Sequence, residues 1–248
     1  RLLLGYGGSE SLQSPSTLWS DDAKAFIAGL GVDLARFETA FDRNLYPTLG
    51  LSRGVFFTRE AYGADKLVTG DPMRMVADDI PPNRMNARTV KAFVADFPLP
   101  EASRAKLVEV YTSTRDPLAG KSIEEKEAFL ETISYRDWLI RHWRLDEPAA
   151  DVFYGRTLDF FAAGTDAVSA REAFDTGYPG FLGLGVKRDE DAAKEMDEPY
   201  IHHFPDGNSS LARLMVRKLV PGVGPGSTMD DIVTSTFDYD KLDRPGAP

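Results

Sequence analysis

Apolar residues recur at helical spacing along most of the chain, with short apolar runs bounded by glycine between them. Leu34, Phe37, Phe41 and Leu45 follow one face of a predicted helix. From about residue 87 onward, successive helical segments each begin on a capping residue or a proline. Ser122 and Glu125 have the spacing of a capping box. The pattern predicts a mainly helical layer with short connections.

Short β-like runs bounded by glycine occur at GVFFTRE (54–60) and DKLVTG (65–70). Strands are also expected near the two ends, at Leu2–Leu4 before a glycine turn and at YIHH (200–203). The predicted fold class is therefore α+β, helix-dominated, with short strands at both ends. We expect residues 1–18 to form a glycine turn and loop, 19–198 a mostly helical domain, and 199–248 a return segment.

Composition narrows the function classes. The 248 residues are 42% hydrophobic and 27% charged, as in a globular protein. A net charge of -10 argues against a nucleic-acid partner, which needs a basic surface, and it is explained by solubility or by a cationic small ligand. Cysteine is absent, which excludes disulfides and thiolate chemistry. No metal-ligand spacing occurs, and no apolar run is long enough to predict a membrane span.

Both ends of the sequence, RLLLG and KLDRPGAP, look cut. We therefore expect a fragment, a processed subunit or an excised domain. Neither glycine-rich stretch, GYGG (5–8) or GFLGLG (180–185), has the context of a dinucleotide-binding fingerprint.

Two segments of the sequence are candidates for a functional site. Gly5, Gly7 and Gly8, followed by Ser9 and Glu10, form either a plain tight turn or a backbone that approaches a phosphate or a flat ring. The second is HHFPDGNSSLAR (202–213), where Asn208 or Ser209 is expected to cap a helix starting near Ser210. The N–H groups at that helix start predict a site for an anion or a ring edge.

Three histidines are present. His202 and His203 are expected on alternate faces of the strand before this helix. Each taken singly fits a structural histidine bonded to a backbone carbonyl slightly better, but the pair together favours a site. His142 is expected in a core or an interface. Tyr178 and Phe181, in a glycine-rich loop, are candidates to line a substrate pocket.

The combination and order of several stretches resembles the bacterial spermidine dehydrogenase family. These stretches are GYGGSESLQSPS, the long segment GVDLARFETAFDRNLYPTLGLSRGVFFTREAYGADKLV, and FPDGNSSLARLMVRKLVPG. The resemblance covers essentially the whole chain. It implies an FAD-dependent enzyme with a flavin amine oxidase-like fold, in which this chain is a central part and the Rossmann-like FAD-binding domain is split around it.

The resemblance also implies residue roles. Gly5, Gly7, Gly8 and Ser9 match the flavin-side turn, and Gly207, Asn208 and Ser209 match the segment that returns toward the flavin. Phe204 would face the substrate, Glu10 would pair with its ammonium group or remain a solvated loop residue, and His203 is the candidate catalytic group. The implied reaction is oxidation of an amine, such as the polyamine spermidine, by hydride transfer to FAD, in a periplasmic enzyme.

The remaining FAD-binding portion would lie in the same or another chain. The alternative is a cofactor-free substrate-binding or interaction domain that is inactive without those flanking parts, because the chain itself lacks a dinucleotide fingerprint.

Overall fold

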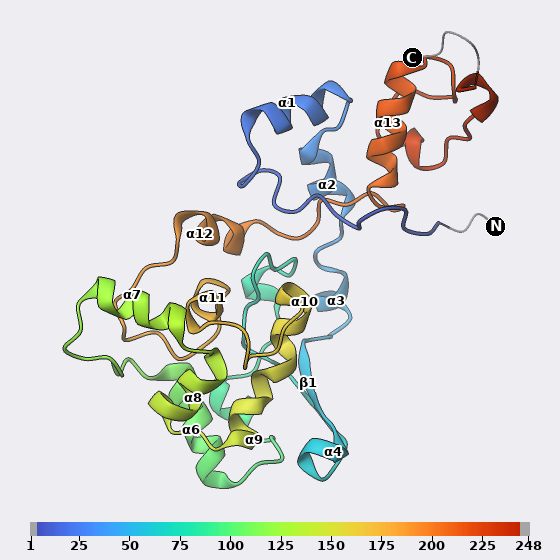
Figure 1. The fold of residues 1–248 in the computed structure, drawn as a ribbon. Helices are drawn as coiled ribbons and strands as arrows, with labels where there is room; N and C mark the ends of the chain where they lie inside the picture. Colours follow the sequence, from blue (N-terminus) through green and yellow to red (C-terminus); the bar gives the residue numbers. More distant parts are fainter. Residues whose placement is uncertain (1–3, 244–248) are drawn as a thin grey trace. The chain divides into compact units, whose positions relative to one another are not determined.

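The computed structural model describes residues 4–243, and these residues form two compact units (Figure 1). The terminal unit combines the described residues up to Asp42 with those from Asp197 onward, and the central unit spans Arg43–Met196. The terminal unit resumes at Asp197, and the return segment was expected from residue 199. Residues 19–42 differ from the expected division, because they belong to the terminal unit rather than to the helical domain.

The elements of each unit have the following bounds. The terminal unit contains α1 Asp21–Gly29, α2 Leu34–Ala40, α13 Ser209–Leu219, and the 3₁₀ turns η3 Asp231–Val233 and η4 Tyr239–Lys241. The central unit contains α3 Leu45–Thr48, β1 Gly54–Phe57, α4 Arg59–Tyr62, β2 Lys66–Thr69, η1 Pro82–Arg84, α5 Val90–Val94, α6 Glu101–Thr112, α7 Ile123–Thr132, α8 Tyr135–Trp143, α9 Glu147–Ala150, η2 Asp151–Thr157, α10 Leu158–Phe161, α11 Ala170–Asp175 and α12 Glu190–Asp197, whose last residue belongs to the terminal unit.

The terminal unit has a core of its own. Ile27 of α1, Phe37 of α2 and Leu214 of α13 are buried in one apolar cluster. Ser20 and Asp33 cap α1 and α2 through side-chain bonds to backbone N–H groups, which fixes where both helices begin. The shared core explains why α1 and α2 group with the C-terminal segment.

The central unit is built around the aromatic face of α8. Tyr135, Trp138 and Trp143 are fully buried, and the ring of Trp138 stacks on Phe181 at 5.6 Å between ring centroids. The predicted capping box at Ser122 and Glu125 is confirmed, with both reciprocal bonds present. Ser134 caps α8 by accepting a bond from the N–H of Asp137. Local capping signals in the sequence therefore give the starts of both helices.

The described residues contain a single sheet, the antiparallel pair β1–β2 of the central unit. Both strands lie where the apolar runs predicted them, so the helix-dominated α+β class is confirmed. The strand expected at 200–203 is wrong: the N–H of Ile201 bonds to the carbonyl of Pro199, and that of His203 to the carbonyl of Ile201. These tight turns, between Pro199 and Pro205, prevent extended pairing. The run expected before the glycine turn lies mostly outside the described residues.

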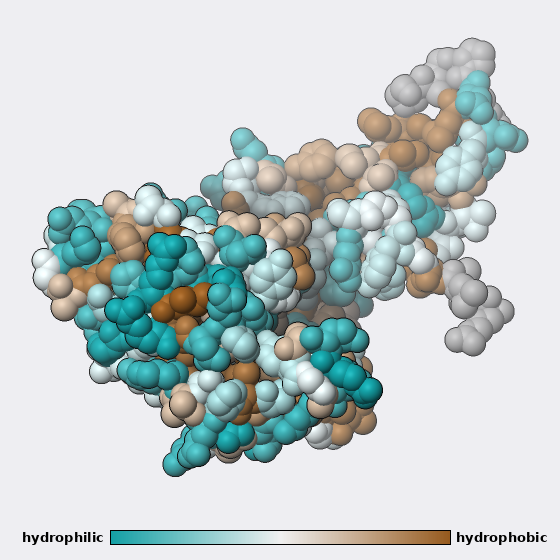
Figure 2. Space-filling view, turned by 60° about the horizontal axis from the view of Figure 1, so that its bottom comes forward, coloured by the Kyte–Doolittle hydropathy of each residue, from teal (hydrophilic) through white to brown (hydrophobic). Residues whose placement is uncertain are grey.

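On the face of the central unit that forms the left-hand part of Figure 2, apolar patches are small and surrounded by polar residues. None of the helices between residues 4 and 243 has the length and apolar character needed to cross a membrane.

Candidate functional site

The glycine turn near the N-terminus lies against the first turn of α13. The N–H of Gly7 donates to the carbonyl of Asp206 at 2.9 Å, and the N–H of Ser209 donates back to the carbonyl of Gly7 at 2.7 Å. The N–H of Asn208 donates to the carbonyl of Ser9 at 2.9 Å. The two candidate segments, about 200 residues apart in sequence, therefore form one structure.

Close packing explains two glycines of this structure. A Cβ added at Gly7 would lie 2.8 Å from the Cβ of Ser209, a distance that real side chains do not adopt. Gly207 has a φ of +72° and lies against the carbonyl oxygens of Ser9 and Gly7. The turn therefore approaches its own chain, which accounts for these glycines without a cofactor.

The start of α13 is not an open anion site. Asn208 occupies the N-cap position, but its side-chain amide donates to Ser9 Oγ and to the carbonyl of Ser11. The hydroxyls of Ser209 and Ser210 bond to Asp206 instead. Because the N–H groups of Asn208 and Ser209 already have carbonyl partners, the expected anion site at this helix end is wrong.

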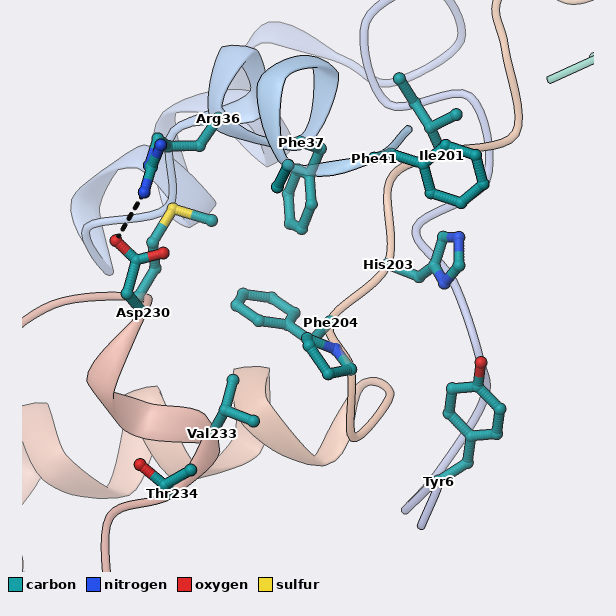
Figure 3. A pocket seen from close by; sticks show the side chains of 13 residues that line it. Tyr6, Arg36, Phe37, Phe41, Ile201, His203, Phe204, Asp230, Val233 and Thr234 are labelled. Atoms are coloured by element: carbon teal, nitrogen blue, oxygen red, sulfur yellow. Dashed lines mark hydrogen bonds and ion pairs between the residues drawn. The ribbon is translucent and has the colours of Figure 1, made fainter. Parts of the chain in front are cut away.

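A pocket of about 400 Å³ lies beside this structure in the terminal unit (Figure 3). Its walls are mainly apolar, from Phe37 in α2, Phe41 directly after α2, and Ile201 and Phe204 before α13. The ring of Phe204 is buried and meets that of Phe37 edge to face at 5.3 Å. Such a pocket suits an aliphatic or aromatic group.

The polar groups at one side of the pocket come from the two candidate segments. The ring of His203 lies between the rings of Phe41 and Tyr200, at centroid distances of 5.4 and 6.1 Å. Tyr6 also lines the pocket, and its hydrogen bond to Glu10 raises the pKa of the Tyr6 phenol. Aromatic faces near a carboxylate favour a cation over an anion.

The other side of the pocket carries a charged pair. Arg36 and Asp230 form an ion pair at 3.2 Å, drawn as the dashed line in Figure 3. Both side chains are mostly exposed, and their charges cancel. This side therefore adds polarity without attracting an ion of either sign.

His202, next to the pocket residue His203, is a structural residue. Its side chain is 3% exposed and its Nδ1 lies 3.7 Å from the carboxylate of Glu198. That carboxylate accepts bonds from the backbone N–H groups of Ser16 and Thr17. The Glu198–His202 pair therefore fastens the N-terminal loop to the segment that carries His203.

Acid is expected to destabilise the terminal unit through His202. Burial lowers the pKa of His202 in the folded protein, although Glu198 partly offsets this. The unfolded chain then binds more protons, so the stability contributed by neutral His202 is complete above about pH 6.5 and is lost as the pH falls below it.

Urea unfolding at a series of pH values would check this. Below about pH 6.5, the free energy of unfolding of His202→Gln is expected to fall less steeply with decreasing pH than that of wild type. Burial also lowers the pKa of His142, which lies in the central unit, so His142→Gln should change the acid sensitivity of the central unit and leave that of the terminal unit as in wild type. Equal slopes for wild type and His202→Gln would contradict the prediction.

Other predicted residues lie elsewhere. Tyr178 and Phe181 are buried in the core of the central unit, packed around Tyr135, and do not line the pocket, which is a correction to their expected role. His142 stacks on Trp138 at 4.8 Å, as a core histidine would. Sequence reasoning missed Phe37 and Phe41 as pocket residues, because their helical spacing is equally typical of core.

The residues assigned to FAD by resemblance fit a flavin only in part. Gly7, Ser9, Gly207, Asn208 and Ser209 are engaged with one another. Gly5 and Gly8 remain exposed, and a Cβ on Gly5 would meet nothing within 4 Å. The turn therefore presents two bare glycines to the outside, but these residues do not form a cofactor cradle by themselves.

No protein-family model matches the chain, and no curated protein sequence shows significant similarity to it. Within residues 4–243, no group of three or more His, Asp and Glu side chains is arranged to hold a metal ion.

Proposed function

We propose that this chain is the substrate-binding part of an FAD-dependent oxidoreductase that oxidises an amine, such as a polyamine of the spermidine type. The observation that carries the proposal is the pocket of about 400 Å³, to which both candidate segments contribute, the first through Tyr6 and the second through His203 and Phe204. The same two segments carry the sequence resemblance to FAD-dependent amine dehydrogenases.

The chemistry of the pocket suits an alkylamine. Phe37, Phe41 and Phe204 provide apolar contacts for methylene groups and exclude water. The aromatic rings near His203 and the carboxylate of Glu10 favour an ammonium group. An amine must lose its ammonium proton before it is oxidised, and the imidazole of His203, in the pocket lining, is the candidate to accept it.

FAD, when bound, supplies the acceptor for the hydride. Its dinucleotide-binding portion, of the split Rossmann-like type, would be contributed by further polypeptide in the same or another chain. In this arrangement Gly5 and Gly8 are the residues of the turn left to approach a flat ring, and the other five assigned residues hold the turn in place.

The alternative, a cofactor-free substrate-binding or interaction domain, is favoured by one specific observation. The turn and the start of α13 satisfy each other's backbone groups, so the chain offers no ready-made flavin site.

A visible absorption spectrum before and after denaturation separates the two functions. Flavin bands released on unfolding support the oxidoreductase, whereas a colourless protein that still binds spermidine in a calorimetric titration supports the binding domain. A colourless protein that binds no amine contradicts both.

His203→Ala is expected to slow amine oxidation at least about tenfold in flavin-containing enzyme without removing the flavin, since general-base groups contribute factors of this size or larger. Steady-state kinetics across pH would check it, with His142→Ala as the matched histidine control. Unchanged turnover and an unchanged pH profile for His203→Ala would assign this residue a purely structural role.

A further inference from the structure

A second pocket borders strand β1 in the central unit. It has a volume of about 410 Å³ and is lined on one side by all four residues of β1, Gly54–Phe57. Asp151, Val152, Gly155 and Arg156 of η2 form the opposite wall. Of the described residues, none from β2 lines this pocket, so it lies along the edge of β1 that faces away from β2. We call it the edge groove.

The hydrogen-bond pattern shows which backbone groups face this groove. The N–H of Gly70 donates to the carbonyl of Arg53 at 2.9 Å, so these residues form a hydrogen-bonded pair in the register of the hairpin. Hydrogen-bonded and non-bonded pairs alternate along an antiparallel ladder. Val55 and Phe57 therefore bond to β2, whereas the N–H and C=O groups of Gly54 and Phe56 point to the open edge.

The open edge is accessible. Gly54 and Phe56 are both exposed, and no side chain on Gly54 covers the backbone. The side chain of Phe56 is 59% exposed and lies opposite Leu67, which is 61% exposed. An edge strand with exposed backbone and apolar neighbours is a template for pairing with another strand.

The charged side chains of the groove lining are paired within the chain. Arg156 pairs with Asp71 and Arg53 with Asp78. Asp151, on the wall formed by η2, pairs with Arg136. Because these charges are already paired, a neutral backbone that forms hydrogen bonds fits the groove better than an ion does.

We propose that an extended segment of another polypeptide binds in the edge groove as a third strand beside β1. Its carbonyls accept from the N–H groups of Gly54 and Phe56, its N–H groups donate to their carbonyls, and its apolar side chains contact Val55 and Val152. A second copy of this chain is a poorer occupant, because its own β1 edge is bordered by η2. Two such edges would meet only if both η2 walls moved.

The test uses a fluorescein-labelled, capped peptide with the sequence of residues 65–70 (DKLVTG), the strand that already pairs with β1. Fluorescence anisotropy is expected to show binding, weakened at least about tenfold when alternate amides of the peptide are methylated, because each methyl group removes a backbone donor. No binding at about 1 mM peptide would overturn the proposal, since backbone pairing depends little on sequence.

Two variants localise the binding. Phe56→Pro removes an N–H that faces the groove without removing a bond to β2, and Phe56→Thr is its control with the N–H kept. Gly155→Leu fills the groove from the opposite wall, where an added Cβ meets nothing within 4 Å. Phe56→Pro relative to Phe56→Thr, and Gly155→Leu relative to the wild-type chain, are each expected to weaken binding at least about tenfold with little change in melting temperature. If both variants bind the peptide as tightly as the wild-type chain does, the proposal is overturned.

Amide hydrogen exchange gives a readout that does not depend on substitutions. In the free chain the amides of Gly54 and Phe56 should exchange fast and those of Val55 and Phe57 slowly, and the peptide should protect the first two. Protection of Gly54 and Phe56 that appears only with rising protein concentration, in step with dimer formation by sedimentation, would assign the edge to a second copy and overturn the proposal.

Discussion

Gly7→Ala is expected to lower the free energy of unfolding of the terminal unit by about 1–3 kcal/mol, the usual cost of overpacking. The added Cβ would lie 2.8 Å from Ser209 Cβ and 3.0 Å from its Oγ. Because φ at Gly7 is not in the left-handed region, the cost is steric rather than conformational. The turn or α13 must move, and the bonds that join them weaken.

Ser209→Gly should rescue this variant, because it removes both atoms that the new Cβ meets. A double-mutant cycle by urea unfolding, with amide exchange at Ser209 as the local readout, is expected to give a coupling of about 1–2 kcal/mol. Gly5→Ala, whose Cβ meets nothing within 4 Å, is the matched control and should change little. If Gly7→Ala leaves stability unchanged and only flavin content falls, the glycine serves the cofactor instead.

The meeting of the glycine turn with α13 shows what the sequence could predict and what it could not. Both segments were identifiable from their residue types, since glycines mark a close approach and Asn208 marks a helix start. Their mutual bonding was not identifiable, because nothing in one segment specifies a partner about 200 residues away. A helix end with free N–H groups and a glycine turn are each typical of a ligand-binding site. Here the two segments form hydrogen bonds with each other instead.

Local signals predicted the fold more completely than the site. The short apolar runs that form β1 and β2 and the caps of α7 and α8 depend on residues a few positions apart, and these were predictable, whereas the pairing of the two strands was not predicted. Phe37 and Phe41 share the spacing of core residues, so only the packed structure separates a pocket wall from a core. The same ambiguity explains the opposite error at Tyr178 and Phe181, whose glycine-rich loop is buried around Tyr135.

Asp71→Asn is expected to lower the free energy of unfolding of the central unit by about 3–5 kcal/mol, the cost of leaving a buried charge unpaired. The Asp71 side chain is 4% exposed and that of Arg156 is 16% exposed, with 2.5 Å between Oδ2 and Nη2. Asparagine keeps the size and can still accept from the N–H of Met73, as Asp71 Oδ1 does. The decrease in the free energy of unfolding therefore reports the effect of the carboxylate charge, because the shape of the side chain is kept.

Two further variants make the result specific. Glu190→Gln breaks an exposed ion pair with Lys194, and it should cost no more than about 0.5 kcal/mol, as surface pairs do. Adding Arg156→Met to Asp71→Asn removes the unpaired guanidinium, so the double variant should recover part of the loss in guanidinium chloride unfolding followed by tryptophan fluorescence. A loss below about 1 kcal/mol for Asp71→Asn would mean that water reaches the guanidinium of Arg156 and solvates it.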